Sequence, residues 1–180
     1  MTSLIISIIA LCVSIANVTW QAARFLLEGP RIRVLMKVGA LGGASLVSAP
    51  VENMKNLDET FASWSSQGFT QPVLVVEVVN KGRLGVQLVD FGVDVPKGAS
   101  VKVIEGVITD TPMPYVLEPH QEAAWAMPFE YVVNFANACQ GTWPRETHPI
   151  SAYVHRAGGK KVRSARSLTL KLTRTQGDSS

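Results

Sequence analysis

The side chains of this chain that could do chemistry are three histidines and a cysteine. His120, His148 and His155 could ligate a metal or act as general bases, and Cys139 could supply a thiolate. The histidines lack the i, i+4 spacing of a helical zinc motif, and with Cys139 they match no known ligand pattern. Cys139 lies among apolar residues, where a cysteine is typically a small buried hydrophobic residue. We therefore expect neither a metal site nor a nucleophile.

The carboxylates do not suggest catalysis either. Asp90 and Asp94 are four residues apart on a predicted strand, so they point the same way about 13 Å apart. That is too far for a pair acting on one bond, and we expect a solvated face. The chain has no GxSxG elbow, and the glycine-rich segment 39–43 lacks the lysine and helix of a phosphate-binding loop. The sequence predicts no catalytic residue, no cofactor and no enzyme.

Three tryptophans of the C-terminal domain are the large side chains that could contact a partner. Trp125 lies between small residues and is expected in the core. Trp64 and Trp143 are expected either to cover an edge of the domain or to form part of a partner surface.

The N-terminal segment predicts a transmembrane anchor over residues 1–29. Leu4 to Trp20 contains no charge and would span about 25 Å as a helix, slightly less than a hydrocarbon core of ~30 Å. Trp20 suits the interfacial aromatic belt, and Arg24 can reach the headgroups. We expect one helix over Ser3–Gly29, mostly within the membrane.

The segment has three other interpretations. A cleaved signal peptide has a passable site at 14–16, but no basic residue precedes Leu4. A lipoprotein signal at Cys12 is disfavoured by the bulky Leu11. A buried core helix is the third, although this segment is apolar all round and has no amphipathic stripe.

Flanking charge predicts the orientation of the anchor. Arg24, Arg31, Arg33 and Lys37 follow the span, whereas the α-amino group is the one cation before it. The positive-inside rule then places the domain in the cytoplasm and the N-terminus outside. The domain has a single cysteine and so no internal disulfide, which suits a reducing compartment. The inverted topology stays open, because long segments can override flanking charge.

Residues 30–174 predict a mainly β domain, an immunoglobulin-like antiparallel sandwich of about eight strands with one short helix. Strands are expected, from alternation and valine content, at 31–38, 72–79, 86–95, 100–108, 115–117, 123–129, 149–156, 161–165 and 167–173. A change of parity predicts a β-bulge near Leu88. Segment 39–70 is expected to be a long loop or hairpin with a helical turn at 57–64, and 129–139 an amphipathic helix. Residues 175–180 are expected to be a disordered tail.

The order of these features carries a resemblance. An uncharged helix is followed by Gly29-Pro30, a basic strand, a valine-rich strand ending in Val79-Asn80-Lys81-Gly82, and Leu117-Glu118-Pro119 with Trp125 downstream. The chain resembles a loose group of uncharacterised bacterial and phage single-span membrane proteins with an immunoglobulin-like sandwich. The resemblance implies a fold and a membrane address, and no activity or site residue.

Charge is separated along the chain. Residues 38–154 carry six basic and twelve acidic residues, whereas 155–174 carry seven basic residues and no acid. If the C-terminal hairpin lies near the first strand, its cations face an anionic leaflet; otherwise they protect a sheet edge. The predicted membrane contacts are Trp20, Arg24, Arg31, Arg33, Lys160, Lys161, Arg163 and Arg166.

These patterns together predict a membrane-anchored, non-enzymatic interaction or accessory module. Its expected partners are the lipid bilayer and a protein, and nucleic acid is disfavoured because the cations lack interleaved aromatic residues. The alternatives are an extracytoplasmic sandwich that binds a ligand or surface, and an envelope factor of the phage-exclusion type.

Overall fold

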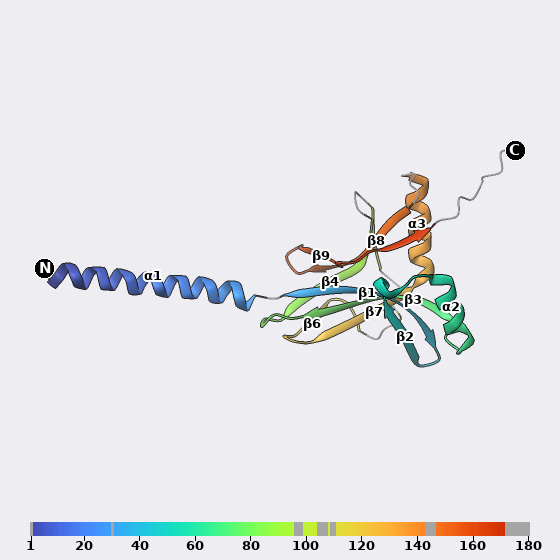
Figure 1. The fold of residues 1–180 in the computed structure, drawn as a ribbon, viewed down its shortest axis with the longest axis horizontal. Helices are drawn as coiled ribbons and strands as arrows, with labels where there is room; N and C mark the ends of the chain where they lie inside the picture. Colours follow the sequence, from blue (N-terminus) through green and yellow to red (C-terminus); the bar gives the residue numbers. More distant parts are fainter. Residues whose placement is uncertain are drawn as a thin grey trace.

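The computed structural model describes residues 2–29, 31–95, 99–103, 108, 111–142 and 147–171. Helix α1 (Thr2–Glu28) extends away from a domain that contains two antiparallel β-sheets (Figure 1). In these residues the domain has ten strands, two α-helices and one 3-10 turn. The prediction of a mainly β domain behind one apolar helix is confirmed, and the predicted numbers of strands and helices are too low.

The first sheet has the strand order β2-β1-β3-β7. Its strands are β1 (Ile32–Gly42), β2 (Ser45–Pro50), β3 (Gln71–Asn80) and β7 (Glu122–Pro128). Strand β1 pairs with β3 from Ile32 to Leu41, but with β2 from Lys37 onward only. The first part of β1 therefore has a strand neighbour on one side.

The second sheet has the order β10-β8-β4-β5, with β6 also pairing with β4 and β9 with β8. Its strands are β4 (Val86–Asp94), β5 (Ser100–Lys102), β6 (Tyr115–Leu117), β8 (Thr147–Arg156), β9 (Lys161–Arg163) and β10 (Leu168–Lys171). The pairing of β4 with β8 shifts register between Leu88 and Asp90, which confirms the predicted bulge. The immunoglobulin-like topology stays a prediction.

One hydrophobic core lies between the sheets. Val34, Met36 and Val38 point into it from alternate positions of β1, as the sequence pattern predicts. Trp125 is fully buried against Phe91, and its indole N–H donates to the Thr111 carbonyl at 2.9 Å. The expectation that Trp125 is a core residue is confirmed.

The segment predicted as a loop or hairpin, 39–70, is more regular than expected. Strand β1 continues to Gly42 and turns into β2, which is followed by η1 (Val51–Asn53) and α2 (Leu57–Ser66). A Cβ atom at Gly39 would lie 2.5 Å from the Val47 carbonyl oxygen, so the strands approach too closely for a side chain there. Glycine usually weakens a strand, and it is required here by this close approach.

Helix α3 (Phe129–Thr142) confirms the predicted amphipathic helix and is about one turn longer. Its buried face includes Val132, Ala136 and Cys139. Helices α2 and α3 lie at the end of the domain opposite α1 (Figure 1).

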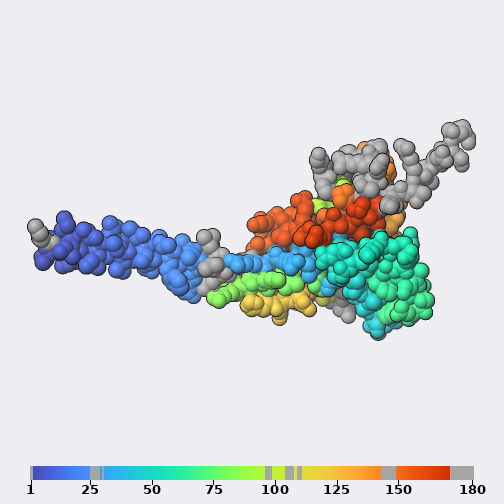
Figure 2. Space-filling model, viewed as in Figure 1, coloured from blue at the N-terminus to red at the C-terminus, as the bar shows by residue number. Residues whose placement is uncertain are grey.

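The strands run between two ends of the domain, the tethered end and the outer end. The tethered end consists of Arg31, 81–85, 118–121 and 157–160, where β1 begins and β3, β6 and β8 finish. The outer end consists of the 43–44 turn, η1, α2 and α3. In the space-filling view α1 stands clear of the domain, and α2 lies at the far side from it (Figure 2).

Candidate functional site

Helix α1 is an exposed apolar rod. Residues Thr2–Arg24 are long and apolar enough to span a membrane, and no part of the span is buried in the fold. Its large apolar side chains are 52–69% exposed, from Leu4 to Trp20. This arrangement excludes the buried core helix that was one interpretation of the sequence. A secretory signal sequence near the N-terminus would have a similar length and composition. A transmembrane anchor stays attached to the chain in the membrane, whereas a signal sequence is cleaved off.

The polar residues within α1 are satisfied inside the helix. The hydroxyls of Ser7, Ser14 and Thr19 each donate to the carbonyl four residues earlier, at 2.8–2.9 Å. Gln21 likewise donates to the side chain of Asn17 at 3.3 Å. A hydroxyl that bonds its own helix exposes no unpaired donor to hydrocarbon. The interruptions in the apolar sequence are therefore compatible with a span.

Asn80 organises the tethered end. Its side chain is fully buried, and Nδ2 donates to the carbonyls of Leu84 at 2.8 Å and of Leu117 and Glu118 at 3.2 Å. Its Oδ1 accepts from the Gly82 N–H at 3.0 Å. One amide thereby fixes the 81–85 loop against the 117–118 segment. The sequence marks Asn80 as a turn residue and does not reveal this role.

The tethered end presents a group of exposed side chains. Its exposed cations are Arg31, Lys81, Arg83 and Lys160, and Leu84 of the same end is 53% exposed. Glu118 and the adjoining Glu122 are exposed carboxylates. The sequence predicts Arg31 and Lys160 as membrane contacts. It does not single out Lys81, Arg83 or Leu84, because they lie in a segment with an acidic net charge.

Two of the predicted membrane contacts, Lys161 and Arg163, are paired with Asp94 and do not belong to the tethered end. Lys161 Nζ and Arg163 Nε lie 2.8 Å and 2.6 Å from Oδ2 of Asp94, whose side chain is 4% exposed. Lys161 Nζ also lies 3.8 Å from the centroid of the Tyr153 ring. These cations cover a buried carboxylate on the outer face of the second sheet, away from the tethered end.

Asp90 and Asp94 do not form the solvated face expected from their spacing. Asp90 contacts His155 Nδ1 at 2.7 Å and Lys102 Nζ at 3.1 Å. Burial, followed by the charge of Asp90, raises the pKa of Tyr153 beside them. Strands β5 and β9 bring cations to both carboxylates, an arrangement that the alternation of β4 alone does not reveal.

Cys139 and His120 are the remaining described candidates for catalysis or metal binding. Cys139 is buried on α3, and burial raises the pKa of its thiol, which lowers its reactivity. His120 is exposed in a turn with a φ of 61°. No group of three or more His, Cys, Asp or Glu side chains placed to hold a metal occurs in the described part of the chain.

A groove of about 780 Å³ lies at the outer end. Phe61 of α2, Phe129 of α3 and Leu170 of β10 are among its apolar walls, with Lys55 and Asp58 also lining it. Trp64 is partly buried, and its ring makes an edge contact with Phe61, with the ring centroids 5.9 Å apart. Trp64 therefore supports the wall of the groove. Trp143 lies outside the described residues.

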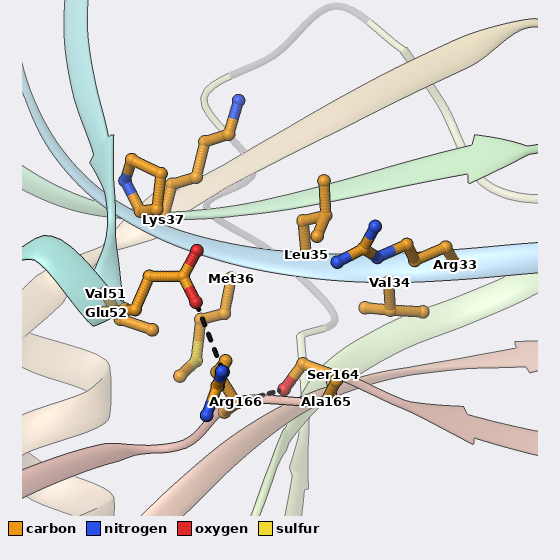
Figure 3. A pocket seen from close by; sticks show the side chains of 11 residues that line it. Arg33, Val34, Leu35, Met36, Lys37, Val51, Glu52, Ser164, Ala165 and Arg166 are labelled. Carbon is orange, nitrogen blue, oxygen red and sulfur yellow. Dashed lines mark hydrogen bonds and ion pairs between the residues drawn. The ribbon is translucent and has the colours of Figure 1, made fainter.

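A second groove, of about 440 Å³, runs along the side of the domain where β1 lacks a strand neighbour (Figure 3). Arg33 and Lys37 of β1 line it with Arg166, whose Nε lies 3.2 Å from Oε2 of Glu52. Lys37 also pairs with Glu77 at 2.6 Å. The predicted membrane contacts Arg33 and Arg166 thus share one groove on the side of the domain.

Comparison with known proteins gives no relative from which a role could be carried over. No protein-family model matches this chain, and no curated protein matches it significantly. The resemblance to bacterial and phage single-span proteins stays a prediction. The geometry of α1 and of the two ends is the basis for the proposals below.

Proposed function

We propose that this chain is a membrane-anchored, non-enzymatic interaction module. Helix α1 spans the bilayer once, the tethered end faces the lipid, and the outer end meets a protein partner. The observation that carries the proposal is the exposure of the apolar side chains of α1 from Leu4 to Trp20. Fully burying one such side chain is worth roughly 1.5–3 kcal/mol, so a rod of ten in water is strongly unfavourable.

Charge supports a cytoplasmic domain. Arg24, Arg31, Arg33 and Lys37 follow the apolar span of α1 within about 15 residues. Positive charge close to a span favours the cytoplasmic side of a membrane.

The non-enzymatic role is supported by how the reactive groups are used. Asp90 and Asp94 are paired with cations that join neighbouring strands, and Cys139 is buried with a raised pKa. The outer end instead offers a groove for a partner's apolar side chain. Exposed carboxylates on η1, α2 and α3, at Glu52, Asp58, Glu59 and Glu130, favour basic residues around that side chain.

Membrane retention tests the anchor. We expect the full chain to stay in the membrane pellet after an alkaline wash. Ile9→Arg/Val13→Arg should release it, since each arginine near the middle of a span costs about 2.5–3.5 kcal/mol. Ser3→Arg, the matched control at the end of the span, should remain in the pellet. An intact, monodisperse chain in the soluble fraction without lipid would contradict the proposal, as would release of a shortened chain cut near residue 16.

A second function is favoured by the volume of the outer groove, which lies within the range of small-molecule sites. It is an extracytoplasmic sandwich that binds a ligand, with the topology inverted. Alkaline phosphatase fused to the C-terminus separates the two, because the enzyme is active outside the cytoplasm only. We expect no activity, and an active fusion would favour the second function.

A further inference from the structure

We propose that the loop Lys81–Gly85 is a lipid-docking element that places Leu84 in the interface of an anionic leaflet. The inference rests on the proposed function, because it requires α1 to span the membrane. It names the surface of the domain that faces the lipid and the headgroup charge which that surface recognises.

The short connection between anchor and domain forces this surface toward the membrane. Four helical residues after Arg24, at 1.5 Å each, and the stretch from Glu28 to Ile32 limit the separation to about 20 Å. Arg24 itself lies at the level of the headgroups if Thr2–Arg24 spans the bilayer. The tethered end is therefore kept within a few Debye lengths, each about 8 Å, of the lipid surface.

The residues of the loop combine charge with an exposed apolar tip. Lys81 and Arg83 precede Leu84 in the loop, and Leu84 is 53% exposed although its backbone is fixed. A single exposed leucine is ordinary on a protein surface. Leu84 differs because Lys81 and Arg83 lie in the same short loop, at the end of the domain that the tether holds near lipid.

The neighbouring charges also favour an anionic surface. Arg31 and Lys160 add to the cations of the loop, against the carboxylates of Glu118 and Glu122. A cation close to an anionic leaflet favours the bound state by about fivefold. The excess of cations predicts that docking depends on anionic lipid and weakens with salt.

The loop is fixed before it meets the lipid. Asn80 holds the Leu84 carbonyl at 2.8 Å and the Gly82 N–H at 3.0 Å, and the Lys81 N–H donates to the Arg31 carbonyl at 2.7 Å. Docking therefore orders little backbone, which lowers the entropy lost on binding.

A spin label on the full chain in nanodiscs tests the proposal. The label is attached to Leu84→Cys, and in the matched control to Leu46→Cys, an exposed leucine of β2 near the outer end. Cys12 is replaced by serine, and Cys139 is buried and does not compete for the label. Collision of the label with a water-soluble nickel complex is compared in phosphatidylcholine discs and in discs containing phosphatidylglycerol.

We expect the collision rate at position 84 to fall by more than half in the anionic discs, since two well-placed cations shift the equilibrium by about 25-fold. The rate at position 46 should not change. Lys81→Gln/Arg83→Gln should remove the fall, whereas Lys55→Gln, an exposed lysine near the outer end, should preserve it.

Equal collision rates at position 84 in both kinds of disc would overturn the docking proposal and leave the anchor intact. Failure of the chain to enter discs at all would overturn the proposed function, and size-exclusion chromatography detects this before any label is measured.

Discussion

The two ends of the domain are built differently. At the tethered end one buried amide, that of Asn80, binds three carbonyls and an N–H, and the loops close tightly around it. At the outer end α2 and α3 cover the sheets with aromatic side chains and leave a groove of about 780 Å³ between them and β10.

The difference indicates a division of work. A fixed surface with an excess of cations suits a broad, uniform target such as a lipid headgroup layer. A groove with apolar walls and exposed carboxylates suits a particular side chain of a partner. Four comparisons, three between paired substitutions and one of chemical modification, test whether the ends differ as much in energy as in construction.

The largest expected effect is at Asn80. Asn80→Ala leaves buried carbonyls without donors and should lower the free energy of unfolding by about 3–4 kcal/mol. Asn56→Ala is the matched change near the outer end. It removes an N-cap that accepts from the Asp58 and Glu59 N–H groups, and should cost about 1 kcal/mol. Urea unfolding in detergent, followed by tryptophan fluorescence, measures both. Equal losses would erase the contrast between the ends.

Asp94 secures the hairpin that carries Lys160 to the tethered end. Asp94→Asn should lower stability by about 2 kcal/mol, less than for a fully buried pair because Arg163 still reaches water. Glu52→Gln, which breaks the exposed pair with Arg166, should change stability by less than about 0.5 kcal/mol. The same unfolding measurement applies, and a larger loss for Glu52→Gln would reverse the expected ranking.

Trp64 tests whether the wall of the outer groove is structural. Trp64→Ala removes the edge contact with Phe61 and should cost about 1–2 kcal/mol, below the cost for a fully buried tryptophan. Trp20→Ala removes the same side chain from α1 and should leave the unfolding of the domain unchanged. Unaltered stability in Trp64→Ala would show that Trp64 does not stabilise the wall of the groove.

The smallest expected effect is on the reactivity of Cys139, which is buried on α3. Burial raises the pKa of Cys139 above the ordinary value of 9.0, so folding favours the protonated thiol. This contribution to stability is complete below the unfolded pKa and is lost as the pH rises through the folded pKa. Near pH 8 the rate of Cys139 alkylation, measured by mass spectrometry, should therefore be lower in the folded chain than in the urea-unfolded chain. The rate in the folded chain should rise above pH 9. Rapid reaction at pH 8 would show that α3 opens.

Local pattern predicts much of the fold. Alternation places Val34, Met36 and Val38 in the core, and the change of parity around Leu88 predicts the bulge. Helix α3 follows from its apolar spacing. Within 39–70 the hairpin alternative and the helical turn at 57–64 follow from the sequence. The continuation of β1 through Gly39 does not, because this glycine is required by a contact with β2, which local propensity does not contain.

The candidate surfaces are predicted less well because they are assembled from distant segments. Lys81 and Lys160 come to the same end of the domain although they are far apart in the chain. Lys161 follows Lys160 directly, yet it faces Asp94 on the sheet. Charge counted along the sequence finds a basic C-terminal segment, and only the strand pairing shows which of its cations are available.

Strand β1 connects the two ends without interruption, and its length has a consequence for any partner. Eleven residues in extended conformation measure about 35 Å. A domain standing on its tethered end therefore holds the outer groove about 35 Å above the headgroups. A protein that occupies the groove must be soluble, or must itself rise that far from the bilayer.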